Sequence, residues 1–138
     1  MNMPDRDGIY EHAKHALQLL ACPAETQIRL LPLFVCVTDE LALDFDHWKR
    51  TLVGNFASEM TAEQIASLTR IDEHFAFLSR GGEGFQVEFW TPNALRESVE
   101  WQRIREMAVQ ALQLFGWPVE SPPSYAHEYI GGGPSPER

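Results

Sequence analysis

Four carboxylates and one imidazole gather in one short stretch of the chain, at Asp39, Glu40, Asp44, Asp46 and His47. Acidic side chains at the start of a helix interact favourably with the helix dipole, which accounts for the first two as part of a solvated face. Asp44 and Asp46 lie further into the segment, which weakens that explanation, but a solvated face is still the favoured interpretation of the whole cluster. The alternatives are a patch that binds a basic surface and a carboxylate–imidazole site for a divalent ion.

The patch predicted for a protein partner extends to one aromatic residue further along the chain. Trp90 lies where an alternating apolar segment meets a helix start, and it is expected to staple the chain against that helix. Tryptophan is also enriched at the anchoring positions of protein interfaces, so an exposed anchor is the alternative role. The predicted binding patch therefore comprises Asp39, Asp44, Asp46, His47 and Trp90.

A different prediction is a metal or small-ligand site between helices. Helical bundles build metal centres from inward-facing His, Asp and Glu side chains on neighbouring helices. Neither a repeated Glu-x-x-His nor an HExxH motif is present, and the nearest match is a single Asp44-x-x-His47. The alternative site is therefore His12, His47, Asp72 and His74, and no cofactor is predicted.

Asp72 is the polar member of an otherwise apolar helical stripe that runs from Ile65 to Leu78. A buried carboxylate requires a hydrogen-bonding or ionic partner, for which Arg103, Arg105 or a tryptophan N–H is available. A structural ion pair is the favoured role for Asp72, and a ligand role is the alternative. His47 lies away from the apolar stripe of its own helix and is expected to face solvent.

The sequence offers little for nucleophilic or phosphate chemistry. Cys22 and Cys36 lie in apolar stretches without a CxxC motif, so we expect buried, unreactive thiols. There is no GxSxG motif. The glycine-rich segment at 79–85 follows a helix and lacks the spacing of a phosphate-binding loop, so it predicts a helix end and a turn.

The net charge of −9 disfavours some classes of partner. Binding to nucleic acid or to anionic lipid depends on Lys and Arg, so neither partner is expected. No apolar run approaches the roughly 20 residues of a membrane span, and the first residues do not resemble a signal peptide. We therefore predict a cytoplasmic protein whose partner, if it has one, is basic.

Hydrophobic periodicity predicts an all-α bundle of four or five helices. Helices are expected at about 8–21, at 24–31 and from about 62 to an end at Gly81 and Gly82, the last with a Thr61–Gln64 capping box. Residues 33–56 predict either one long helix beginning just after Pro32, which we favour, or a strand at 34–37 followed by a helix from Leu41. The final helix, 92–115, is expected to break near Ser98 because its two apolar sets face different ways.

Two segments are expected to be non-helical. Phe85, Val87 and Phe89 alternate with polar residues, which is typical of a strand, although a strand without a partner favours an extended linker near 85–90. The Pro/Gly-rich residues 118–138 predict a tail. The expected organisation is a helical domain over 1–117 and a tail that docks through Tyr125 and Tyr129 to about residue 130 and is disordered beyond.

These features favour a non-catalytic protein-binding or regulatory module, such as a small immunity-like protein that neutralises a partner. The alternative is a helical-bundle enzyme or sensor with a metal or small-ligand site lined by His and Asp. The sequence does not fix the oligomeric state.

Overall fold

The computed structural model describes residues 5–31 and 36–123, and within these ranges the regular secondary structure is all helical, with no strand. Four long helices dominate: α1 (Arg6–Ala21), α3 (Val37–Phe56), α4 (Ala62–Leu78) and α6 (Val99–Phe115). Two short helices, α2 (Ala24–Leu30) and α5 (Pro92–Glu97), lie together at one end of the bundle. The predicted all-α bundle is confirmed.

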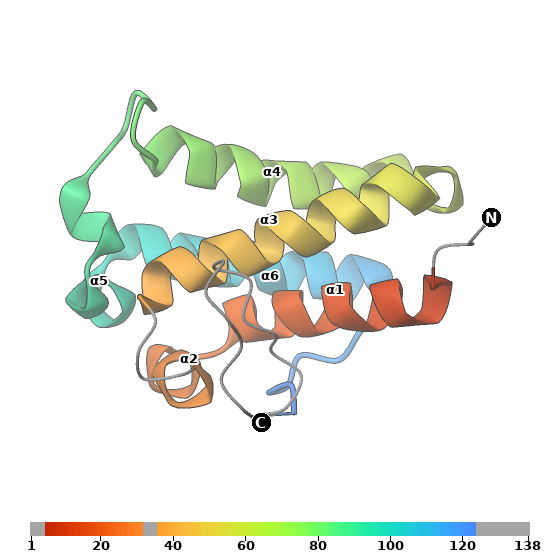
Figure 1. Cartoon of the computed structure of the whole chain (residues 1–138), viewed down its shortest axis with the longest axis horizontal. Helices are drawn as coiled ribbons and strands as arrows, with labels where there is room; N and C mark the ends of the chain where they lie inside the picture. The colour runs from red at the N-terminus through yellow and green to blue at the C-terminus, as the bar shows by residue number, and fades with distance from the viewer. Residues whose placement is uncertain (1–4, 32–35, 124–138) are drawn as a thin grey trace.

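The long helices run alternately up and down, so that neighbours are antiparallel (Figure 1). Helix α1 packs closely against both α3 and α6, and α4 packs against α6. A tight 3-10 turn, η1 (Ala57–Glu59), joins α3 to α4 at one end of the molecule. From this turn the two helices diverge, and their contact is much less extensive than that of α1 with α3. This divergence opens the groove described below.

Local sequence signals fix the helix ends. The backbone N–H of Gln64 donates to the Thr61 hydroxyl at 3.0 Å, and the Gln64 side-chain oxygen accepts from the Thr61 N–H at 2.9 Å, which completes the predicted capping box. Ser98 accepts from two backbone N–H groups at the start of α6, so the predicted break before this helix is present. Gly116 ends α6 with φ of 72°, a left-handed conformation that glycine adopts without steric cost.

Aromatic rings form the centre of the core at the end of the bundle that carries α5. Trp101 and Phe89 stack in parallel with 4.6 Å between ring centroids, and Phe75 meets Trp101 edge-on at 5.6 Å. The Trp101 indole N–H donates to the Phe89 carbonyl at 2.8 Å, so its one polar group is satisfied although the side chain is fully buried. This cluster lies beneath the diverging ends of α3 and α4.

A buried arginine ties the short helices to the bundle. The Arg105 guanidinium donates to the Cys22 carbonyl and to the Gln27 side-chain oxygen, each at 3.1 Å, and also to the Leu95 carbonyl. Gln27 in turn donates to two carbonyls at the end of α1. Because these acceptors come from α1, α2 and α5, one side chain on α6 positions all three elements.

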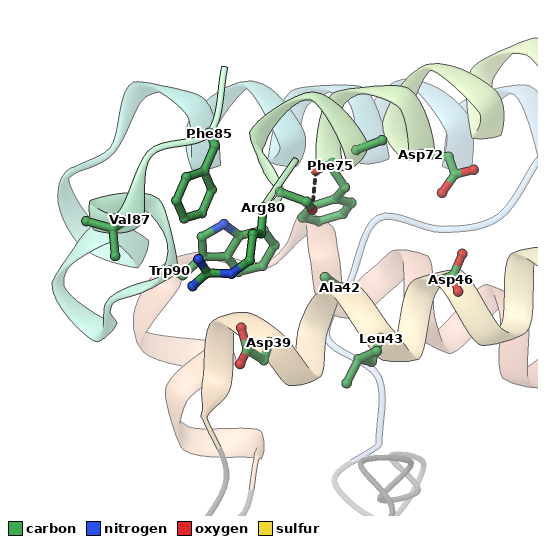
Figure 2. Close-up of a pocket in the computed structure, with 12 residues that line it drawn as sticks. Asp39, Ala42, Leu43, Asp46, Asp72, Phe75, Arg80, Phe85, Val87 and Trp90 are labelled. Atoms are coloured by element: carbon green, nitrogen blue, oxygen red, sulfur yellow. Dashed lines mark hydrogen bonds between the residues drawn. The ribbon is translucent and has the colours of Figure 1, made fainter. Parts of the chain in front are cut away.

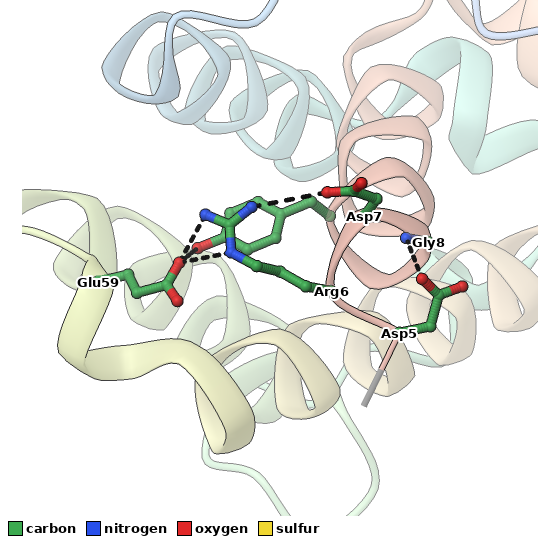
Figure 3. A network of polar contacts seen from close by, with 6 residues as sticks. Asp5, Arg6, Asp7, Gly8 and Glu59 are labelled. Carbon is green, nitrogen blue, oxygen red and sulfur yellow. Dashed lines mark hydrogen bonds and ion pairs between the residues drawn. The ribbon is translucent and has the colours of Figure 1, made fainter. Parts of the chain in front are cut away.

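A second polar network links α1 to the turn between α3 and α4 (Figure 3). The Arg6 guanidinium donates to the Glu59 carboxylate at 2.7 Å, and the Tyr10 hydroxyl donates to the same oxygen at 2.9 Å. Asp5 accepts from the Gly8 N–H at 3.2 Å and so caps α1. The groups are largely exposed, so they orient the end of the bundle more than they stabilise it.

Three expected elements differ in the structure. Cys36 is extended and precedes the first turn of α3, so this helix begins at Val37 and not just after Pro32; residues 32–35 lie outside the described ranges. Helix α4 ends at Leu78, before the glycines. Val87–Trp90, in the segment expected to be extended, form a 3-10 turn, η2, and the described residues contain no strand.

The thiols and the tail also differ in part from expectation. Cys22 is buried, and burial raises the pKa of its thiol, whereas Cys36 is exposed because it precedes the helix. Pro122 is buried, and the Pro118 carbonyl accepts from the Gln18 side chain at 3.0 Å. Tyr125, Tyr129 and the rest of the predicted tail lie outside the described residues. No helix in the described part is both long and apolar enough to cross a bilayer.

Candidate functional site: an apolar groove with acidic walls

An open groove of about 580 Å³ lies between the diverging ends of α3 and α4 (Figure 2). Helix α3 forms one wall and helix α4 the other. The connection from α4 to α5 closes the wide end, where Phe85, Val87 and Trp90 lie. The groove therefore exists because α4 follows α6 and not α3 over most of its length.

The wall on α3 presents residues at helical spacing. Ala42 and Leu43 are adjacent, and each lies three or four residues from Asp39 and from Asp46, so the four share one face of the helix. This face is separate from the buried stripe of Leu41, Phe45 and Leu52 that packs into the core. Helix α3 thus has a second face, which pairs apolar side chains with two carboxylates and lies open to the groove.

The wall on α4 has the same spacing. It is lined by Phe75 and Ala76, which are adjacent, and by Asp72 and Ser79, each three or four residues from that pair. Phe75 belongs to the core aromatic cluster and is mostly buried, so its ring forms the floor of the groove. Because α3 and α4 are antiparallel, Asp72 lies across from Asp46, and the apolar residues of both walls lie beyond them towards the closed end (Figure 2).

Hydrogen bonds hold the closed end of the groove in place. The Trp90 indole N–H donates to the Leu78 carbonyl at 3.0 Å, and the Thr38 hydroxyl donates to the Trp90 carbonyl at 2.9 Å. The Arg80 guanidinium lies 5.2 Å from the centroid of the Phe85 ring, within the range of a cation–π contact. These bonds tie Trp90 to α3 and α4, whereas the predicted staple was to the helix that follows it, and Trp90 also lines the groove.

The carboxylates on the walls differ in their partners. The Lys49 ammonium contacts the Asp72 carboxylate at 3.2 Å, and Arg50 pairs with Asp46 one turn away on the same helix. Within the described ranges, Asp39 has no hydrogen bond or ion pair through its side chain. Among the described residues, the groove therefore contains one carboxylate without a partner at its closed end, where the Arg80 guanidinium also lies, and two carboxylates at its narrow end that Lys49 and Arg50 contact.

The structure divides the predicted binding patch. Asp39, Asp46 and Trp90 line the groove together. Asp44 is buried and has an interaction partner, so it is not part of a solvent-facing patch. His47 is exposed, as expected, but its ring meets Trp48 edge-on at 4.6 Å and does not line the groove.

The residues of the predicted metal site lie apart. His12 stacks on Trp48 at 4.3 Å, and His74 contacts the Glu100 carboxylate at 2.7 Å. Asp72 is about 39% exposed, so the expectation that it is buried is wrong. Its partner is Lys49 and not Arg103, Arg105 or a tryptophan. Among the residues that the structure describes, no three His, Cys, Asp or Glu side chains are placed to hold a metal ion.

Sequence reasoning missed the apolar half of the groove. Leu43, Phe85 and Val87 are large, exposed apolar side chains that surround it. Leu43 carries a signal in the sequence, because it falls beside Asp39 and Asp46 at helical spacing and off the buried stripe. Phe85 and Val87 carry none, because their alternation with polar residues has the same form in an exposed turn and in a strand.

Comparison with known proteins finds no matching family, no similar curated protein and no similar solved structure. The site is therefore interpreted from its own geometry and chemistry.

Proposed function

We propose that the chain is a non-catalytic binding or regulatory protein, and that the groove between α3 and α4 holds a partner protein that carries basic residues beside an apolar side chain. The observation that carries this proposal is the combination of an open apolar groove with carboxylates on both walls. Each feature alone is common on protein surfaces, whereas the acidic–apolar–acidic order of α3, with Asp72 of α4 facing it, is a specific pattern.

The apolar part of the groove supports a protein partner. Leu43 is 47% exposed and Val87 is 60% exposed, and both border the same opening. Large apolar side chains that gather around a concavity and are surrounded by polar residues mark interaction sites more often than scattered ones do. The aromatic floor is fixed by the core cluster, so little ordering free energy is lost when a partner side chain enters.

The charge of the chain supports a basic partner. The net charge of −9 attracts a positively charged protein over a distance, and Asp39 offers a carboxylate without a partner among the described residues. Electrostatic attraction of this kind raises the association rate and weakens at high salt.

A site-specific photo-crosslink tests the proposal. A photoreactive amino acid replaces Leu43 in the groove, or Leu114, which is similarly exposed at the far end of the bundle. We expect a discrete crosslinked partner from Leu43 and none, or a different set, from Leu114. Asp39→Asn with Asp46→Asn should remove the Leu43 product.

The matched control for this charge change is Glu106→Gln with Glu120→Gln. Both glutamates are exposed and lie outside the groove, so the net charge of the protein changes equally. The control should keep the crosslinked product. Loss of the product in both double variants would show that net charge alone is responsible, and absence of any product at Leu43 would contradict the proposal.

A small ligand is the second candidate, favoured by the volume of the groove. A volume of about 580 Å³ lies within the usual range of small-molecule pockets, and the lining is mainly apolar with a few polar groups, as such pockets are. An aromatic amine would place its ring over Phe75 and its ammonium at Asp39. Thermal unfolding with 2-phenylethylamine tests this, since a ligand of the native state must raise the melting temperature.

A further inference from the structure

We infer that the occupant of the groove is a basic amphipathic helix of the partner protein, with an apolar residue at its centre and Lys or Arg about one turn to either side. This inference rests on the proposed binding function and specifies the structure of the segment that is bound. It follows from three features of the groove: the spacing of its residues, the order of acidic and apolar residues along it, and a mostly apolar lining without a strand edge among the described residues.

The spacing of the walls matches a third helix. On α3 the carboxylates of Asp39 and Asp46 are seven residues apart, which corresponds to about 10 Å along the axis at 1.5 Å per residue. Leu43 lies between them. A helix that lies along this wall presents residues on one face at the same intervals, so a basic–apolar–basic face would meet an acidic–apolar–acidic one.

Along the groove, each position on the binding face of the occupant helix has residues to contact. At the narrow end Asp46 and Asp72 lie across from each other, and at the closed end Asp39 lies near the aromatic residues (Figure 2). Ala42, Ala76 and the ring of Phe75 form the apolar middle of the groove, between these two ends. A large apolar residue of the occupant fits there, because the two alanines leave room above the phenylalanine ring.

The ion pairs already present at the narrow end leave the site open to a cation. A carboxylate has two oxygens and accepts several hydrogen bonds, and Lys49 contacts only one oxygen of Asp72. Arg50 is 73% exposed, so its pair with Asp46 contributes little stability and gives way readily. A Lys or Arg of the occupant can therefore share or replace these contacts.

A helical occupant is favoured over an extended one because of its backbone. A helix satisfies its own N–H and C=O groups, whereas an extended segment needs partners for them. The described part of the chain contains no strand whose edge would provide such partners. Much of the groove lining is apolar side chain, so an extended segment would bury unpaired polar groups against it.

The probe is a labelled synthetic peptide of about 15 residues, the length at which isolated helices begin to form in water. It is based on alanine and glutamine, with leucine at the centre of one face and lysine at i−3 and i+4 from it. The comparison peptide has the same composition, but its lysines and leucine are spread around the helix. We expect fluorescence anisotropy to show at least ten-fold tighter binding of the first peptide, and circular dichroism to show that it gains helicity when bound.

Two tryptophan variants locate the binding site. Ala76→Trp fills the groove from its α4 wall, and because Ala76 is exposed the change leaves the core intact. Ala66→Trp is the matched control, since Ala66 is exposed on the same helix outside the groove. We expect Ala76→Trp to weaken peptide binding at least ten-fold and Ala66→Trp to leave it within two-fold, with both proteins unfolding as cooperatively as the wild type.

The outcomes separate this inference from the proposed function. Equal binding of both peptides, or no binding of either, overturns the helical occupant, and the Leu43 crosslink then still decides whether the groove binds a protein. Binding that Ala76→Trp does not weaken shows that the peptide binds outside the groove, and this also overturns the inference. A protein that self-associates, and that Ala76→Trp makes monomeric, would assign the groove to a second copy of the chain and overturn it as well.

Discussion

The indole nitrogen of Trp90 donates a 3.0 Å hydrogen bond to the carbonyl oxygen of Leu78, the last residue of α4. The final carbonyls of a helix have no partner within the helix, so this bond satisfies one of them. The Trp90 carbonyl accepts from the Thr38 hydroxyl on α3. One residue of η2 therefore connects the ends of both helices that form the groove and fixes its width there.

Replacement of Trp90 by phenylalanine removes this bond and keeps an aromatic ring. We expect Trp90→Phe to lower the free energy of unfolding by about 1 kcal/mol, the usual net contribution of one hydrogen bond. Urea denaturation followed by circular dichroism measures it. Trp117→Phe is the control, because within the described residues the Trp117 indole N–H donates to no protein group. Equal losses in the two variants would show that the bond to Leu78 contributes nothing.

Signals that are local in the sequence predicted the structure well. The capping box at Thr61 depends on residues within one turn of each other, and the break at Ser98 was predicted from the apolar periodicity of a single helix; both are present. The apolar stripe of α3 from Leu41 was also predicted, because a helix must bury its apolar face whatever it packs against. These features need no knowledge of the tertiary arrangement.

Features that depend on which helices pack together were predicted less well. Asp72 was expected to be buried because its helical stripe is apolar, but α4 turns this position towards the groove, where Lys49 reaches it. Asp44 was expected in a surface patch and is buried instead. Asp72 is partly exposed because α4 diverges from α3 at this position. Periodicity within one helix carries no information about that divergence.

The buried guanidinium of Arg105 provides a second prediction. Replacement by methionine keeps an unbranched apolar stem but leaves the Gln27 oxygen and the Cys22 and Leu95 carbonyls without their donor. We expect Arg105→Met to lower the free energy of unfolding by roughly 3 kcal/mol, because unsatisfied buried acceptors cost 1–3 kcal/mol each and some will rehydrate. Urea denaturation measures the loss.

Arg103→Met is the control for this variant. Arg103 lies on the same helix, is exposed, and has no hydrogen bond or ion pair within the described ranges. Its replacement should change stability by no more than about 0.5 kcal/mol. A loss at Arg105 as small as that at Arg103 would mean that the three acceptors do not depend on the guanidinium.

The cap at Ser98 provides a third prediction. Its hydroxyl accepts from the Glu100 and Trp101 N–H groups at 3.0 and 3.3 Å and starts α6 directly after α5. Ser98→Ala should lower the free energy of unfolding by about 1 kcal/mol, as loss of an N-cap does. Ser58→Ala, at an exposed serine outside any cap, should be neutral. Thermal unfolding of both variants tests this prediction. Similar melting temperatures would show that the helix break between α5 and α6 does not depend on the Ser98 cap.

The pH dependence of stability provides the last prediction, through His15 on α1. Burial lowers the pKa of His15 below its ordinary value of 6.5, and Glu11, 3.1 Å away, only partly opposes this effect. The unfolded chain therefore binds a proton at a higher pH than the folded chain does. Stability should decrease as the pH falls below 6.5 towards the lowered pKa of the folded state.

Replacement of His15 by glutamine should remove this part of the pH dependence. Melting temperatures measured from neutral pH down to about 4.5 should decrease less steeply in His15→Gln than in the wild type. Glu11, Glu25 and Glu59, whose pKa values lie below the ordinary value of 4.5, also reduce stability at the acid end of this range, but all three are present in both proteins, so the difference between the two slopes is assigned to His15. His47→Gln, at an exposed histidine, should keep the wild-type slope. The same slope in His15→Gln and in the wild type would show that the proton is bound equally well in the folded and unfolded chains.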